Sequence, residues 1–252
     1  MNQSFSFKMA QIMKLDAKPS LAPDADETLD VFLDGRLKIV QPRNGYRFSI
    51  DAVLLAEFVT VRPKDTLIDL GTGCGIIPLL LLIKNSIQQA MGLEIQPALA
   101  RLAGRNAVLN GFEEKMQVII GDLKQPPFGP GSADWVVCNP PYRRKESGRI
   151  NPDPQKAIAR HEIRTSLNDI LATGSRLLRT KGRMAMVYPA IRLADILARM
   201  RAYRLEPKRL QLVYPDLKTG AELVLIEAVL NGRSGLQILP PLLGQGDFSI
   251  GT

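Results

Sequence analysis

The sequence predicts an α/β fold, built on a doubly wound, mainly parallel sheet. Short apolar runs alternate with helical stretches through the middle of the chain, as in folds with a parallel sheet. A glycine-rich turn at residues 71–75 joins the first of these runs directly to a helix. Polar residues stand at the ends of four successive runs. Because ligands of open parallel sheets bind at the carboxyl ends of the strands, these residues predict the functional edge.

Composition indicates a soluble globular protein. The chain has 252 residues, 45% of them hydrophobic and 23% charged, which suits one large domain. The longest apolar run, residues 76–83, is too short to span a bilayer, and residues 1–30 lack the apolar segment of a signal peptide. The two cysteines predict neither a disulfide framework nor a metal site. We therefore expect a cytoplasmic protein without membrane or metal, present as a monomer or weak homodimer.

The net charge of +8 is concentrated in one part of the chain. Residues 1–142 hold 14 Lys and Arg against 15 Asp and Glu, whereas residues 143–210 hold 17 against 6. The basic part begins directly after the motif at residues 139–142. This boundary predicts that a polyanion such as RNA is gathered beside the candidate site, although a solvated basic surface has the same composition.

One domain is expected over residues 29–243, between a disordered or loosely docked segment, residues 1–28, and a tail, residues 244–252. Its first part, residues 29–60, contains an Asp-Gly hairpin signal followed by a helix. Further helices are predicted after the glycine turn, from Pro97, from the capping pair Ser166 and Asp169, and over residues 191–203. Seven strands are predicted, with the last two as antiparallel neighbours because their connection is short: 66–70, 90–95, 116–120, 135–138, 183–188, 210–214 and 223–230.

Four strand ends carry candidate ligands for a cofactor and a substrate. Asp69 closes the first strand, Glu94 the second, Asp122 follows the third and Asn139 the fourth. Glu94 lies 21 positions after Gly73, a spacing that suits a carboxylate accepting hydrogen bonds from a ribose diol. Each residue alone is also compatible with an ordinary cap or turn. Their succession in one sheet favours a binding edge.

The motif Asn139-Pro140-Pro141-Tyr142 follows the apolar run of residues 135–138, where two prolines end any strand. An asparagine oxygen and a proline-fixed carbonyl suit the two hydrogens of a planar amine. They favour the tetrahedral nitrogen that forms as a methyl group arrives. Tyr142 offers a face on which a base can stack. The same four residues also suit a simple turn, so the prediction of methyl transfer depends on the strand ends upstream.

Together these motifs resemble a class I S-adenosylmethionine-dependent amino-methyltransferase. Matches over residues 48–56, 157–162 and 235–242 extend the resemblance to the bacterial valine-tRNA adenine N6-methyltransferase family, over about residues 29–243. The resemblance implies a Rossmann-like seven-stranded sheet with an antiparallel last strand. It implies S-adenosylmethionine as cofactor, tRNA as partner, and methylation of the adenine 3′ to the anticodon.

The resemblance also implies roles for the cofactor-binding residues. The first strand end and the glycine turn would position the methionine part, the second strand end the ribose hydroxyls, and the residues after the third strand the adenine amine. An acid on the preceding helix would help close the pocket. These residues are, in that order, Asp69 with Gly71, Gly73 and Gly75; Glu94; Asp122 with Leu123; and Asp51.

On the substrate side, the resemblance implies that Asn139 and the carbonyl of Pro140 hold the target amine while Tyr142 stacks on the base. Pro141 and the basic loop over residues 143–164 are expected to contact the substrate. The loop begins with Arg143, Arg144 and Lys145, although a mobile solvated loop has a similar composition. His161, the only histidine, is expected to be structural because this chemistry needs no strong base.

Other functions fit parts of the same pattern. The fold and cofactor also suit methylation of rRNA, DNA or a protein glutamine amide, because the Asn-Pro-Pro-Tyr motif is shared with enzymes of those classes. The basic part of the chain argues against a protein substrate. A nonenzymatic RNA-binding module would keep the fold without using the motif. The glycine turn alone also fits an NAD-dependent oxidoreductase, which would leave the motif unexplained.

Overall fold

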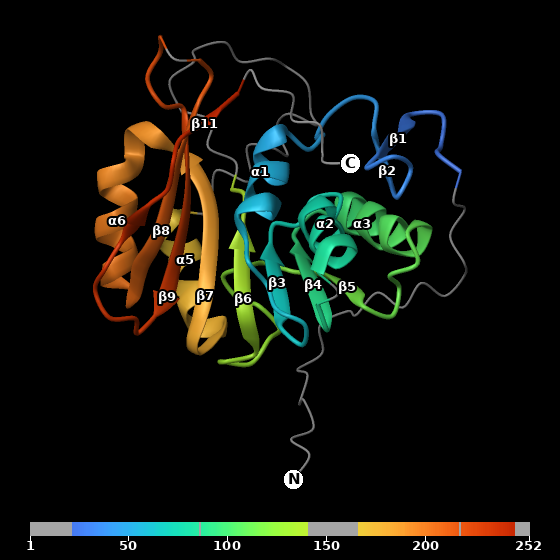
Figure 1. Ribbon diagram of the computed structural model, residues 1–252. Coiled ribbons are helices and arrows are strands. Elements are labelled where there is room, and N and C mark those ends of the chain that lie inside the picture. Colours follow the sequence, from blue (N-terminus) through green and yellow to red (C-terminus); the bar gives the residue numbers. More distant parts are fainter. Residues whose placement is uncertain (1–21, 86, 141–165, 217, 245–252) are drawn as a thin grey trace.

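The computed structural model describes residues 22–85, 87–140, 166–216 and 218–244, and centres on one large mixed sheet (Figure 1). The strand order is β10-β8-β9-β7-β6-β3-β4-β5, and β11 also pairs with β8. The pairs β5-β4, β4-β3, β3-β6 and β6-β7 are parallel, whereas β9 is antiparallel to both β7 and β8. This confirms the predicted sheet and its antiparallel last strand. The seven main strands are β3 (Thr66–Leu70), β4 (Gln89–Glu94), β5 (Met116–Ile120), β6 (Ala133–Cys138), β7 (Leu178–Pro189), β8 (Leu205–Tyr214) and β9 (Leu223–Leu230).

Helices cover both faces of the sheet, as apolar parallel strands require. On one face, α1 (Ile50–Phe58), α2 (Ile76–Asn85) and α3 (Pro97–Leu109) form a core that includes Leu67 of β3. On the other face, α5 (Leu167–Leu177) and α6 (Leu193–Ala202) pack in a second core with Ile68 and Leu70. Alternate residues of β3 therefore face opposite cores. None of the described helices is long and apolar enough to cross a membrane.

The predicted N-terminal hairpin consists of β1 (Glu27–Phe32) and β2 (Leu37–Pro42), paired antiparallel. It begins slightly before residue 29, and its first residue, Glu27, is bound to Arg105 of α3 across 2.9 Å. Both partners are largely buried. The hairpin is thus fixed against the helix that follows β4.

The capping box predicted before α5 is present. The Ser166 hydroxyl accepts a hydrogen bond from the Asp169 backbone N–H at 3.2 Å, and the Asp169 carboxylate accepts one from the Ser166 N–H at 2.9 Å. These contacts satisfy two donors at the helix start that would otherwise lack partners. They explain why the helix begins at Leu167.

Two strands and one helix depart from the predicted bounds by the most, whereas β4 and β6 differ by one or two residues at their ends. Strand β8 begins at Leu205 rather than at residue 210, because Pro207 lies at a register shift where its missing N–H costs no ladder bond. Strand β7 starts at Leu178 rather than at residue 183. The predicted helix over residues 191–203 divides into the short 3-10 helix η2 (Ala190–Arg192) and α6. The proline-rich segment adds β10 (Gln237–Ile238) and β11 (Leu242–Leu243) in parallel to β8.

Candidate active site

The strand register brings three of the predicted strand ends to one edge of the sheet. Asp69 lies opposite Gly92 of β4 and Val137 of β6, and Glu94 lies opposite Ile120 of β5. Asn139 therefore lies two residues beyond Val137, the β6 residue that pairs with Asp69. Because β6 is adjacent to β3, a substrate held at Asn139 is next to whatever the turn after Asp69 binds.

The glycine turn runs in the left-handed region and approaches its surroundings closely. Gly73 has φ +58°, and a Cβ there would lie 2.7 Å from the ring of Tyr46. At Gly75, φ is +86° and a Cβ would lie 2.7 Å from the Met116 methyl group. Larger residues would be strained at both positions. Sequence analysis did not single out Tyr46, which covers the turn from the segment before α1.

Asp69 is a buried carboxylate without a hydrogen-bond partner among the described residues. Its side chain is 1% exposed, and both carboxylate oxygens lack a partner, as does the buried Thr72 hydroxyl. Burial raises the pKa of Asp69 to about 7. The nearby Thr72 hydroxyl offsets part of this rise, although it lacks the geometry of a hydrogen bond. The negative charge of Glu94 raises the pKa of Asp69 further by repulsion. Such a carboxylate is suited to a positively charged ligand group.

Glu94 is oriented by two backbone amides. Its Oε2 accepts a hydrogen bond from the Gly73 N–H at 2.9 Å, and its Oε1 accepts one from the Gln96 N–H at 2.9 Å. Burial raises the pKa of Glu94, and the N–H groups of Gln96, Gly73 and Ile95 oppose that rise. The carboxylate is thus held against the glycine turn, where its remaining lone pairs can accept from a diol.

The other predicted cofactor residues lie at separate positions. Asp122 is exposed after β5, and its Oδ1 accepts from the Lys124 N–H at 2.9 Å. The Leu123 carbonyl accepts a hydrogen bond from the Thr173 hydroxyl of α5 at 2.8 Å. Asp51, in the first turn of α1, lines a hollow of about 460 Å³ near the ends of β8 and β9.

The motif after β6 is described for its first two residues. Asn139 is half-buried and Pro140 is buried. The preceding Cys138 donates its thiol hydrogen to the Leu70 carbonyl at 3.2 Å, which ties the end of β6 to the residue before the glycine turn. Five predicted substrate-side residues and the lone histidine lie outside the described residues: Pro141, Tyr142, Arg143, Arg144, Lys145 and His161.

Neither cysteine is poised for chemistry at neutral pH. Both are buried, and burial raises the pKa of the Cys74 thiol to about 12 and that of Cys138 well above its ordinary value. Both therefore remain protonated, so neither is a ready nucleophile. Within the described ranges, no three His, Cys, Asp or Glu side chains gather where they could hold a metal ion.

Asn106 of α3, which sequence analysis missed, connects the glycine turn to the hairpin. Its Nδ2 donates to the Cys74 carbonyl at 2.9 Å and to the Val40 carbonyl at 3.0 Å, while its Oδ1 accepts from the Val40 N–H at 2.8 Å. One turn later, Asn110 binds the backbone of Lys38 in the same way. The only signal in the sequence was the repeat of asparagine four positions apart, at Asn106 and Asn110.

Replacing Asn106 with leucine is expected to lower the free energy of unfolding by about 3 kcal/mol, because buried backbone groups lose their partners. It should also weaken S-adenosylmethionine binding, since the turn at Cys74 loses its anchor. Asn110→Leu is the matched control, with a more exposed side chain and an expected loss of about 1 kcal/mol. Urea unfolding and calorimetry measure both effects. Equal losses in the two variants would contradict a special role for Asn106.

Comparison with known proteins agrees with this geometry. Residues 47–199 match the model of the Methyltransferase small domain family. A tRNA1(Val) (adenine(37)-N6)-methyltransferase from Porphyromonas gingivalis is 32% identical over 189 residues, covering 72% of this chain and 73% of that protein. A protein of the same name from Tolumonas auensis is 29% identical, covering 60% of this chain and 62% of its own length.

Solved structures share the fold. A predicted O-methyltransferase from Agrobacterium tumefaciens superimposes with a TM-score of 0.63 at 20% identity, covering 79% of this chain and 89% of that chain. A geranyl diphosphate methyltransferase in complex with S-adenosylmethionine gives 0.51 at 21% identity, covering 71% and 84%. The matched length and identity, together with the sheet and its glycine turn, assign the chain to the Methyltransferase small domain family, among the tRNA1(Val) (adenine(37)-N6)-methyltransferases.

Proposed function

We propose that this protein transfers a methyl group from S-adenosylmethionine to N6 of an adenine in tRNA, namely adenine 37, 3′ of the anticodon of valine tRNA. Relatives of that name support the reaction and the substrate. The observation that carries the proposal is the position of Asn139 and Pro140, directly after β6 and beside the turn that follows Asp69. The residues that would hold the target amine and the turn that would hold the cofactor thus follow two adjacent strands.

The cofactor suits the residues at the edge of β3 and β4. S-adenosylmethionine supplies a methyl group carried on a positively charged sulfur. Asp69, whose buried oxygens lack partners among the described residues, would face the positively charged methionine part together with the glycine turn. Glu94 would accept from the ribose hydroxyls, and Asp122 with the Leu123 backbone would meet the adenine. For Asp51 we keep the proposal that it helps to close the pocket.

The proposed chemistry needs two acceptors and no strong base. The Asn139 Oδ1 and the Pro140 carbonyl would accept the two hydrogens of the adenine amine. The nitrogen lone pair is then directed out of the ring system, and the positive charge that develops on nitrogen is stabilised by the asparagine oxygen. The extra proton can leave to water. Tyr142 would stack on the base, and His161 is left with a structural role.

A tRNA loop is a favourable substrate for such a site. Bases of a single-stranded loop can be splayed out and stacked at a cost of a few kcal/mol at most, whereas a base in a duplex must also be unpaired and flipped out. With 6% aromatic residues, the chain is expected to gain RNA affinity mainly from phosphate contacts. We further propose that it acts in the cytoplasm as a monomer or weak homodimer, which fractionation and light scattering would test.

Neutralising Arg143, Arg144 and Lys145 together is expected to weaken tRNA binding. Each lost phosphate contact should reduce the slope of log affinity against log salt by about 1, so the triple variant should show a slope flatter by up to about 3. Fluorescence anisotropy at several salt concentrations measures this change. A slope equal to that of the wild type would place the RNA elsewhere on the surface.

The reaction itself is tested by supplying methyl-labelled S-adenosylmethionine together with total RNA, genomic DNA and protein from a strain lacking the gene. Mass analysis should find N6-methyladenosine in tRNA alone. Label in DNA or protein would preserve the fold and cofactor but overturn the substrate. No label in any fraction would favour a nonenzymatic RNA-binding module.

A further inference from the structure

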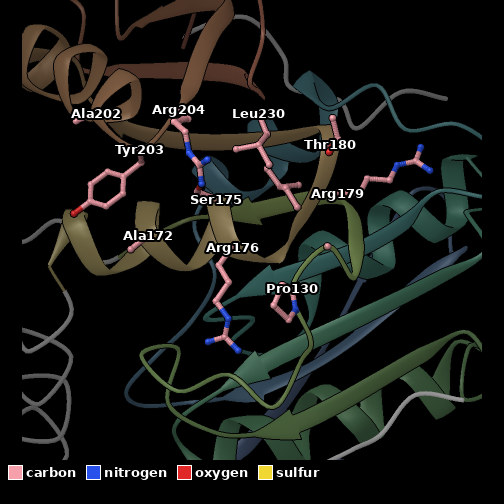
Figure 2. A pocket seen from close by; sticks show the side chains of 12 residues that line it. Pro130, Ala172, Ser175, Arg176, Arg179, Thr180, Ala202, Tyr203, Arg204 and Leu230 are labelled. Atoms are coloured by element: carbon pink, nitrogen blue, oxygen red, sulfur yellow. The ribbon is translucent and has the colours of Figure 1, made fainter. Parts of the chain in front are cut away.

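A hollow of about 630 Å³ lies at the end of the sheet opposite the candidate active site. It is lined by the last turn of α5, the residues after α6 and the start of β7, including Ser175, Arg176, Tyr203 and Arg204 (Figure 2). The first residue of β7, Leu178, also lines it. Because Asn139 follows the carboxyl end of β6, the six-residue length of that strand separates the two places by about 20 Å.

The lining of this hollow is basic and contains no acidic residue. Three arginines line it, and one of them, Arg179, is paired with Asp134. Arg176 donates to the Phe128 carbonyl at 3.3 Å, and within the described ranges neither Arg176 nor Arg204 forms an ion pair. In Figure 2 the side chains of Arg176 and Arg204 reach different parts of the hollow, while Arg179 extends away from both. Two guanidinium groups are therefore available at separate points.

Arg204 occupies a left-handed turn that is held in place by backbone hydrogen bonds. Arg204 has φ +60°, a left-handed conformation that glycine or asparagine usually occupies after a helix. The turn is fixed by hydrogen bonds from the Arg204 N–H to the Arg201 carbonyl at 3.0 Å and from the Asn231 N–H to the Arg204 carbonyl at 2.8 Å. Lys181, next to Thr180 of the lining, is also left-handed, with φ +64°. Left-handed backbone is uncommon for residues other than glycine, so the basic lining contains one such position and borders a second.

We infer that this hollow binds two phosphates of the tRNA backbone, one at Arg176 and one at Arg204. The inference rests on the proposed function, which makes tRNA the partner. A guanidinium group binds phosphate through paired hydrogen bonds, and the Ser175 hydroxyl adds a donor beside it. Since the target base lies in the anticodon loop and this hollow is about 20 Å from Asn139 at the opposite edge of the sheet, we assign the two phosphates to an arm of the tRNA outside the anticodon stem-loop.

The test is the double variant Arg176→Gln and Arg204→Asn, assayed with a full-length valine tRNA transcript and with its isolated anticodon stem-loop. Glutamine is a good helix former and asparagine accepts left-handed backbone, so both changes are compatible with the fold. Arg201→Gln is the matched control, because Arg201 is already paired with Glu206 at 2.9 Å and does not line the hollow. Anisotropy gives Kd over a series of salt concentrations.

For full-length tRNA, we expect the double variant to raise Kd about tenfold and to reduce the salt slope by about 2. Binding of the stem-loop should stay unchanged, and the control should match the wild type with both RNAs. Unchanged binding of full-length tRNA, or equal weakening for both RNAs, would overturn the inference. If the double variant and the control bind the two RNAs as expected but the wild-type protein methylates no tRNA, the proposed function is wrong and the inference stands.

Discussion

Replacing Asn139 with alanine is expected to lower kcat for tRNA methylation by about two to three orders of magnitude, the usual cost of losing one preorganised electrostatic contact to a transition state. The Kd for S-adenosylmethionine should stay near that of the wild type, because Asn139 follows β6 whereas the glycine turn follows β3. Single-turnover kinetics and calorimetry measure the two quantities separately.

Asn139→Asp is the informative control, since a carboxylate keeps an acceptor at the same position. It should retain more activity than the alanine variant. If Asn139→Ala weakened cofactor binding as strongly as it slowed turnover, the division of roles between the ends of β6 and β3 would be wrong. Loss of fold is excluded by comparing thermal unfolding of the variants.

Cofactor affinity is expected to rise by roughly tenfold between about pH 6 and pH 8, because a cationic ligand requires the ionised form of Asp69, whose pKa in the cofactor-free protein is about 7. Asp69→Asn should bind S-adenosylmethionine about a hundredfold more weakly and lose most of this pH dependence, since it removes the carboxylate whose pKa is about 7. Calorimetry over this pH range measures both effects. A wild-type affinity that does not change with pH would contradict the account.

The same residue predicts an opposite effect on stability. Its folded pKa lies above the ordinary value of 3.8, so between about pH 4 and pH 7 the folded protein holds a proton that the unfolded chain has released. The contribution of Asp69 to the free energy of unfolding therefore falls as pH rises through this window. At pH 8, Asp69→Asn should stabilise the cofactor-free protein by up to about 4 kcal/mol. Urea unfolding at pH 5 and pH 8 tests this, and a destabilised variant at pH 8 would contradict it.

Much of the fold was predictable because its signals are local. The bounds of β3, β5 and β9 agree with the runs that predicted them, and the capping box before α5 needs only Ser166 and Asp169. Each of these elements depends on neighbouring residues and on one repeating period. The order of the strand ends Asp69, Glu94 and Asn139 was similarly readable, because parallel strands bring their carboxyl ends to one edge.

Features set by distant partners were not predictable. Pro207, a residue type that normally interrupts a ladder, lies within β8 because the register shift opposite β9 accommodates it. Asn106 contacts residues 32 and 66 positions away, and Tyr46 covers Gly73 only after the chain has folded. The basic hollow likewise joins Arg176 and Arg204 from different elements. The pKa of Asp69 depends on complete burial, which a sequence pattern does not quantify.

The central claim is tested most directly with two valine tRNA transcripts that differ only in whether position 37 carries adenine or guanine. Each is incubated with the protein and methyl-labelled S-adenosylmethionine, then digested and analysed by mass. The account predicts N6-methyladenosine in the adenine transcript, approaching one methyl group per tRNA, and no label in the guanine transcript. Equal labelling of both transcripts, or a labelled nucleoside other than N6-methyladenosine, would contradict it.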